Sequence, residues 1–225
     1  MTSSPAILIL GGGVFGLPSA LELRARGWQV TLLDAGSIPH PDAASTDISK
    51  VIRMDYGADE QYTAMGELSI QRWREWNASW GVDLYHEDGF LIMTRGDMQP
   101  GSFEHDSHAF LTARGGWLMR KDSAALRREH PQWKAEAFCH GYLNPQGGWG
   151  ESGKVVSMLK RDAIAAGVKV HEHVQFGSWI VEAGRHVGMK ETAGREWRAD
   201  LVLSALGAWT SEYLPWLSHR LWATA

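Results

Sequence analysis

Three glycines near the N-terminus have the spacing of a nucleotide-binding turn. Gly11, Gly13 and Gly16 fill the pattern G-x-G-x-x-G directly after the apolar run 7–10, which is typical of a buried parallel strand. The first glycine permits a sharp turn, the second lets a pyrophosphate approach the backbone, and the third lets a helix pack closely on the strand. A helix that begins here directs unpaired N–H groups at phosphates. The spacing therefore predicts a dinucleotide site.

A carboxylate stands where such a site needs one. Asp34 ends the predicted strand 29–33 and follows Gly11 by 23 positions, close to the offset of about 20 expected for the acid that binds a ribose 2′-OH. The same charge would repel a ribose 2′-phosphate, which disfavours NADP. The alternative is a bare strand–helix–strand unit in which the glycines serve packing alone.

Two further pairs of residues could do chemistry. Lys50 and Arg53 stand three positions apart, so that a helical turn would place both cations on one face; spacing alone favours two solvated charges at a helix edge. His171 and His173 alternate along the predicted strand 168–174 and so share a face that could bind a metal. No third ligand is evident, so no metal site is predicted.

Composition limits the class of protein. The chain has 225 residues, of which 44% are hydrophobic and 21% charged, as in ordinary globular proteins. Its formal net charge of −4 gives no reason to expect nucleic acid or an anionic membrane as partner. The single Cys139 excludes an internal disulfide framework. We find no secretion signal and no apolar segment of transmembrane length, and expect an intracellular protein.

Local patterns predict the elements that position these residues. The predicted helices are one that opens at Gly16 and stops at Gly27, residues 60–77 with Asp59 as N-cap, residues 123–129, and an amphipathic one after Gly150 that stops at Gly167. The predicted strands are residues 7–10 and 29–33, a hairpin of 82–86 with 90–93, residues 137–142 and 168–174, a β-meander over 179–181, 187–189 and 196–198, and a buried strand from Leu201. Residues 95–108 are polar and poorly periodic.

The order of these parts suggests an interrupted domain. Residues 1–80 and 149–225 are predicted to form the nucleotide-binding domain, and residues 81–148 part of a mixed α/β domain inserted into it. The fold class is α/β, with a parallel sheet and a β-meander.

Four segments together resemble a known family. They are GGGVFG with its terminal Asp34, DISKVIRMDYG, GYLNPQGGWGESGKVV and ADLVLSALGAW. In this order they are similar to the FAD-dependent amine and amino-acid oxidase superfamily (D-amino-acid oxidase-like), and specifically to its monomeric sarcosine oxidase branch. Lys50 stands where sarcosine oxidases usually carry arginine, which looks closer to fungal fructosyl-amine and saccharopine oxidases. The resemblance implies a Rossmann-type FAD-binding domain and part of a substrate domain.

The resemblance also implies roles for individual residues. Lys50 would lie beside the flavin and stabilise its reduced anionic form, and Arg53 would grip a substrate carboxylate. Val174 would contact adenine through its backbone, and Ser45 and Ser49 would lie in the loop that faces the pyrophosphate and flavin. The FAD-binding set implied is Gly11, Gly13, Val14, Phe15, Gly16, Asp34, Ala35, Ser45, Ser49, Lys50, Val174, Ala205, Gly207 and Trp209.

The reaction implied is oxidation of a C–N bond. A small amine or amino-acid substrate would lose a hydride from the carbon next to nitrogen, the imine would hydrolyse, and O₂ would be reduced to H₂O₂. The expected compartment is the cytoplasm or the peroxisome. Members of the family run to roughly twice this length, so we expect a C-terminal half or a partner chain to complete the pocket. Two alternatives stay open: a non-catalytic FAD-binding fragment, and an NAD-dependent reductase.

Overall fold

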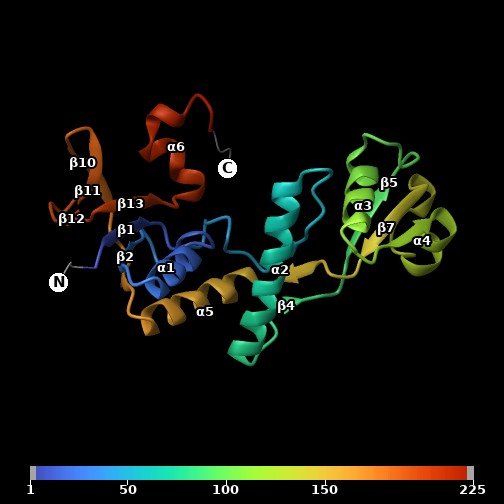
Figure 1. Cartoon of the computed structure of the whole chain (residues 1–225), viewed down its shortest axis with the longest axis horizontal. Coiled ribbons are helices and arrows are strands. Elements are labelled where there is room, and N and C mark those ends of the chain that lie inside the picture. The colour runs from blue at the N-terminus through green and yellow to red at the C-terminus, as the bar shows by residue number, and fades with distance from the viewer. Residues whose placement is uncertain (1–3, 222–225) are drawn as a thin grey trace. The chain divides into compact units, whose positions relative to one another are not determined.

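The computed structural model describes residues 4–221 and divides the chain into two compact units. The first unit consists of Met1–Ile48 and Ser152–Ala225, and the second of Ser49–Glu151. The first unit therefore comes from both ends of the sequence. Each unit has its own sheets and its own core, and Figure 1 shows their elements along the chain.

A four-stranded parallel sheet forms the centre of the first unit. Its strands are β1 (Ala6–Leu10), β2 (Gln29–Leu33), β9 (Lys169–His171) and β13 (Leu201–Ser204), in the order β13-β1-β2-β9. The predicted strands 7–10 and 29–33 are confirmed. All four carboxyl ends meet at one edge of the sheet, because the strands are parallel.

Two helices and a β-meander surround this sheet. The helices α1 (Gly16–Ala25) and α5 (Ser152–Ala165) contact each other and the strands beside them. Leu8 and Leu10 point to the other face, where they pack with Met189 and Trp197 of the meander. The sheet is thus covered on both faces, which explains why β1 is apolar throughout.

The meander and the C-terminal segment complete the first unit. The strands β10 (Phe176–Glu182), β11 (Arg185–Glu191) and β12 (Glu196–Arg198) pair antiparallel as predicted, although the first two are longer than expected. Positive φ angles of 48° at Ala183 and 76° at Gly184 form the tight turn between β10 and β11. After β13 come η2 (Gly207–Trp209), α6 (Thr210–Tyr213) and η3 (Pro215–Leu217).

The second unit contains two small antiparallel sheets and three helices in the part of the chain that the structure describes. One sheet has the order β3-β8-β4, from Lys50–Ile52, Gly148–Gly150 and Tyr85–His86; the other has the order β5-β7-β6, from Phe90–Thr94, His140–Asn144 and Met119–Asp122. The helices are α2 (Glu60–Trp80), α3 (Phe103–Ala113) and α4 (Ser123–Glu129), and the short η1 covers Ala135–Ala137. The mixed α/β class is confirmed, as are the helices predicted at 60–77 and 123–129. The side chain of Asp59 caps α2 by accepting from Tyr62 N at 2.9 Å.

Several sequence predictions in the second unit are wrong. The hairpin of 82–86 with 90–93 does not form, since β4 pairs with β8 and β5 with β7. The helical turn considered as one possibility for Lys50 and Arg53 does not form either, because Lys50–Ile52 pairs with Gly148–Gly150 as strand β3. The strand predicted at 137–142 begins later, at His140. The polar stretch near 95–108 contains the start of α3, whose N-cap Ser102 accepts from His105 N at 3.2 Å.

His171 and His173 of the first unit do not share one face of a strand, although their alternation predicted it. Strand β9 ends at His171, and His173 has a left-handed φ of 61°, so the two histidines do not alternate along one strand. Within residues 4–221, no cluster of three His, Cys, Asp or Glu side chains could hold a metal ion. A search of the same residues for helices finds none with the length and apolar character needed to cross a membrane.

The compact units also differ in outline from the predicted functional domains. Helix α2 belongs to the second unit, whereas the sequence assigned residues 1–80 to nucleotide binding. The functional boundaries at residues 80 and 148 stay a prediction.

Candidate functional site

The glycine turn has the geometry that its spacing predicts. Gly11 has a φ of 106°, and a Cβ on it would lie 2.3 Å from the carbonyl oxygen of Ala205, so a side chain is excluded on two grounds. A Cβ on Gly16 would lie 1.8 Å from the carbonyl oxygen of Gly11. Helix α1 therefore approaches β1 as closely as two backbones permit. Its first-turn N–H groups lie at the carboxyl edge of the sheet, where they can meet an anion.

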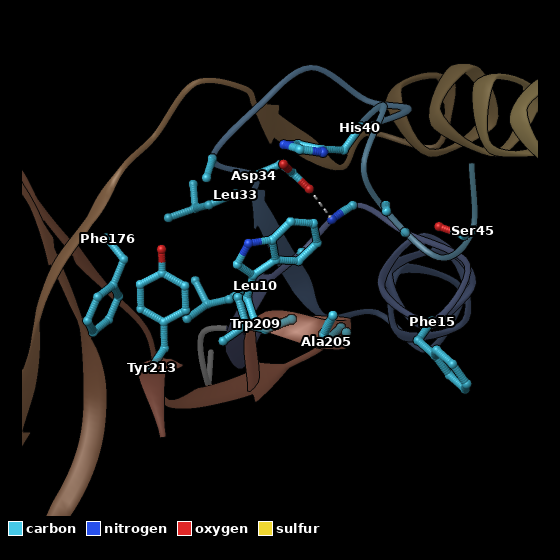
Figure 2. Close-up of a pocket in the computed structure, with 18 of the residues that line it drawn as sticks. Leu10, Phe15, Leu33, Asp34, His40, Ser45, Phe176, Ala205, Trp209 and Tyr213 are labelled. Atoms are coloured by element: carbon cyan, nitrogen blue, oxygen red, sulfur yellow. Dashed lines mark hydrogen bonds between the residues drawn. The ribbon is translucent and has the colours of Figure 1, made fainter. Parts of the chain in front are cut away.

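Asp34 is tied to this turn by its carboxylate. Oδ2 accepts from Gly12 N at 2.7 Å (Figure 2), and Oδ1 accepts from Gly36 N at 2.9 Å. The two bonds fix the plane of the carboxylate and leave a further lone pair on each oxygen for a ligand hydroxyl. Asp34 is thus a pre-oriented acceptor at the end of β2.

A cavity of about 490 Å³ opens beside Asp34 and lies wholly in the first unit. Its volume is within the range of small-molecule sites. Many of the residues predicted to bind cofactor line it: Gly11, Gly13, Val14, Phe15, Asp34, Ala35, Ser45, Val174, Ala205, Gly207 and Trp209. Gly16 is not in the lining, since it packs beneath the turn against Gly11.

Phe15 and Val174 line the cavity but are restricted in what they can offer a ligand. Phe15 is 77% exposed, and Figure 2 shows its ring pointing away from the other labelled side chains. The N–H of Val174 already donates to the carbonyl of Asp34 at 2.9 Å, so a contact from Val174 to adenine would fall to its carbonyl oxygen. By contrast, the hydroxyl of Ser45 stands over the turn, 3.0 Å from where a Cβ of Gly13 would lie.

The sequence did not predict the aromatic side of the cavity. His40, Phe176 and Tyr213 line it, together with the predicted Trp209. Phe176 and Tyr213 meet edge to face at 5.0 Å, and Trp179 Nε1 donates to the carbonyl of Tyr213 at 2.9 Å. The position of His40 in the chain was a usable signal. A loop that leaves the end of β2 must cross the carboxyl edge of the sheet, where ligands bind.

A half-buried ion pair holds that loop in place. Glu172 accepts from Ile38 N at 2.6 Å and from Lys160 Nζ at 2.6 Å, and Lys160 also donates to the carbonyl of Ile38 at 3.3 Å. Burial acts to raise the pKa of Glu172, but the bonds from Lys160 and Ile38 outweigh it, and the pKa lies below its usual value. The carboxylate is therefore charged at neutral pH and fixes the loop that carries His40.

The predicted catalytic residues Lys50 and Arg53 belong to the second unit, as does Ser49, which was predicted to bind cofactor. Ser49 and Lys50 are exposed, and Lys50 pairs with Gly150 in the sheet. Arg53 is half-buried: its Nη1 donates to the carbonyl of Asp55, and its guanidinium lies 4.6 Å from the ring centre of Tyr56. Phe90 and Phe103 flank it at 5.6 Å each. The roles of these residues beside a flavin stay predictions.

A buried carboxylate anchors the segment that carries Arg53. Asp55 is fully buried and accepts from Tyr142 Oη at 2.7 Å and from Asn144 Nδ2 at 3.0 Å. Burial, followed by the charge of Asp55, raises the pKa of Tyr142 well above its usual range. Tyr142 is therefore protonated at all ordinary pH values and always donates to Asp55.

Removing that hydroxyl should destabilise the second unit. Tyr142→Phe leaves a buried charge with one hydrogen bond fewer, and we expect the free energy of unfolding to fall by about 2 kcal/mol. Urea unfolding followed by circular dichroism measures the change. Tyr62→Phe is the matched control, because Tyr62 is 54% exposed on α2. Equal unfolding midpoints for both variants would show that the bond to Asp55 contributes nothing.

Comparison with known proteins supplies the family. The family model described as "FAD dependent oxidoreductase" matches residues 6–221, nearly the whole chain. The chain belongs to this FAD-dependent oxidoreductase family. The residues of the cavity fit such a cofactor, since the turn has a cradle that a Cβ would fill and Asp34 presents an oriented carboxylate.

Relatives of this chain include amino-acid oxidases. It is 26% identical to L-saccharopine oxidase of Schizosaccharomyces pombe over 98% of the chain and 54% of that protein. It is 21% identical to monomeric sarcosine oxidase of a Bacillus species, over 92% of the chain and 52% of the relative. The predicted resemblance to saccharopine and sarcosine oxidases is confirmed. The chain spans about half the length of these relatives.

Solved structures agree on the fold. L-proline dehydrogenase from P. horikoshii superposes with a TM-score of 0.81 at 18% identity, over 98% of the chain and 57% of that structure. A modified fructosyl peptide oxidase from Aspergillus nidulans gives a TM-score of 0.77 at 21% identity, over 93% of the chain and 51% of that structure. The family does not favour the two alternatives that the sequence left open, the NAD-dependent reductase and the non-catalytic fragment.

Proposed function

We propose that this chain binds FAD and serves in the oxidation of the C–N bond of a secondary amine or N-substituted amino acid. One observation carries the proposal: Asp34 and the glycine turn are bonded to each other in the lining of one cavity, in a chain whose relatives include amino-acid oxidases. The carboxylate suits an unphosphorylated ribose, which agrees with FAD and disfavours a 2′-phosphate.

The first unit would hold the ADP half of the cofactor. Asp34 accepts from the ribose hydroxyls, and the backbone around Gly13 with the start of α1 faces the pyrophosphate. Ser45, which stands over Gly13, supplies a hydroxyl to the same phosphates. The carbonyl of Val174 accepts from the adenine amino group. None of these contacts needs the second unit.

The second unit would bind the substrate. Bound FAD would supply the hydride acceptor for the carbon beside the amine nitrogen and, once reduced, the two electrons and two protons that convert O₂ to H₂O₂. The amine nitrogen loses its proton as the C=N bond forms, and water hydrolyses the imine. Lys50 supplies positive charge beside the flavin, and Arg53 binds the carboxylate of the substrate with its remaining N–H donors.

Substrate charge tests the role of Arg53. In the flavin-loaded protein supplied with the C-terminal half of a relative, Arg53→Met should raise KM for sarcosine by about 100-fold, because a charge-assisted bond is worth about 1.5–3 kcal/mol. A neutral secondary amine of similar size should be affected less than threefold, and peroxide release measures both. Arg72→Met, an exposed arginine paired with Glu75 on α2, is the control. An equal loss on both substrates would show that Arg53 supports the aromatic residues around it instead.

The reaction itself is tested by substrate screening. The 225-residue protein is loaded with FAD and supplied with sarcosine, pipecolate, saccharopine and a fructosyl amino acid, and peroxide is measured with and without a C-terminal half from a relative. The proposal expects oxidation of at least one of these amines when the second half is present. Bound FAD without oxidation of any amine under either condition would contradict the proposed reaction but not the binding of FAD.

A further inference from the structure

We propose that His40 and Trp209 form a ring pair that binds the ribose–pyrophosphate part of an adenine nucleotide. The proposal rests on the function proposed above and deepens it by assigning a role to His40, which the sequence did not predict. The two rings meet edge to face, with centres 5.2 Å apart and planes at 67°. Both line the cavity beside Asp34.

The topology explains why this contact matters. Trp209 follows β13 and His40 follows β2, and in the sheet β1 lies between these two strands. A contact between the two rings therefore bridges the carboxyl end of β1, where the glycine turn begins. Figure 2 shows the indole of Trp209 between Asp34 and Ala205. A nucleotide that reaches from Asp34 to the glycine turn must lie against this bridge.

The imidazole of His40 is held from several sides. Its Nδ1 accepts from Asp42 N at 3.2 Å, so the neutral ring carries its proton on Nε2. The backbone two residues earlier is fixed at Ile38 by Glu172 and Lys160. These contacts order the ring before any ligand arrives, so that little entropy is lost on binding.

Gly36 is the residue that lets His40 approach. A Cβ on Gly36 would lie 2.3 Å from Cδ2 and 2.8 Å from Nε2 of His40. The N–H of Gly36 is also a donor to Asp34. The imidazole is thus packed over the residue that orients the ribose-binding carboxylate, which places the ring pair at the ribose. The edge of the imidazole suits the anionic linkage and the face of the indole suits the sugar beside it, because an aromatic ring is positive at its edge and negative on its face.

The test measures ADP binding to the full chain by calorimetry, with FAD titrated in parallel. We expect His40→Ala and Trp209→Ala each to weaken ADP binding by about tenfold, and the double variant to be no weaker than Trp209→Ala alone, because the rings act as one unit. His40→Phe keeps the ring contact and should stay within threefold of wild type. His186→Ala is the matched control, since His186 contacts Trp179 and Trp216 in the same unit outside the cavity lining.

Gly36→Ala gives a second test that leaves both rings in the sequence. Gly36 is not among the glycines with positive φ, so alanine fits its backbone and acts by displacing the imidazole. It should reproduce the loss seen in His40→Ala, whereas the thermal midpoints of all variants without ligand should stay within about 2 °C of wild type.

The outcomes separate the two proposals. If wild type binds neither ADP nor FAD, the proposed function fails. If wild type binds ADP and the variants bind as well or more tightly, or if the two single losses multiply in the double variant, FAD binding stands and the ring pair is refuted. Weaker ADP binding in both single variants, with no further loss in the double variant, supports the ring pair.

Discussion

Replacing Asp34 with alanine should weaken FAD binding by about 10- to 100-fold. The carboxylate is expected to accept from the ribose hydroxyls, and hydrogen bonds to a charged group are worth about 1.5–3 kcal/mol. The same substitution also removes the acceptor for Gly12 N and Gly36 N, which are held at 2.7 Å and 2.9 Å. Both effects weaken FAD binding, because the ribose loses its acceptor and the turn loses the group that orients it. Calorimetric titration with FAD measures the loss.

Asp42→Ala is the control for that experiment. Asp42 lines the same cavity and carries the same charge, but its N–H rather than its carboxylate makes the bond to His40. We expect its FAD affinity to stay within about twofold of wild type, since a surface charge contributes little. If Asp34→Ala binds FAD as tightly as Asp42→Ala, the ribose assignment is wrong.

Replacing Gly16 with alanine should disrupt the first unit. The added Cβ would lie 1.8 Å from the carbonyl oxygen of Gly11, and backbone cannot yield as the end of a flexible side chain can. Helix α1 must move away from β1, at a cost of about 3 kcal/mol, near the upper end for overpacked sites. Since that movement displaces the helix start from the phosphates, FAD affinity should fall more than 100-fold. Calorimetric melting and FAD titration measure the two effects.

Gly153→Ala provides the matched substitution. Gly153 lies in α5 of the same unit, and a Cβ there would meet nothing closer than 3.4 Å. Alanine also favours the helix by about 0.5–1 kcal/mol, so we expect stability equal to wild type or slightly higher. If the Gly16→Ala and Gly153→Ala variants melt at the same temperature, close packing at the turn is not required.

The parts of the fold that depend on neighbouring residues were predictable from the sequence. The glycine turn and the cap at Asp59 are set by contacts within a few residues, and both were predicted. The wrong hairpin involves long-range pairing instead: Phe90 pairs with Asn144, more than fifty residues away, and local turn residues could not reveal this. Helix α3 was missed although its signals are present, because the cap at Ser102 and the acidic first turn follow a polar, aperiodic stretch.

The site divides in the same way. Asp34 is recognisable because its distance from Gly11 along the chain is set by one strand–helix–strand unit. His40, Phe176 and Tyr213 reach the cavity from a loop, a meander strand and a C-terminal helix, whose meeting depends on tertiary packing. Arg53 illustrates the limit of spacing, since its partners Tyr56, Phe90 and Phe103 become neighbours only in the folded unit.

Titration of the 225-residue protein with FAD, NAD and NADP tests the central claim most directly. The cavity of the first unit predicts one FAD site per chain, competition by ADP, and flavin absorption that stays with the protein on gel filtration. NAD should bind more weakly and NADP least, because Asp34 repels a 2′-phosphate. Absence of flavin binding, or tighter binding of NAD than of FAD, would contradict the account.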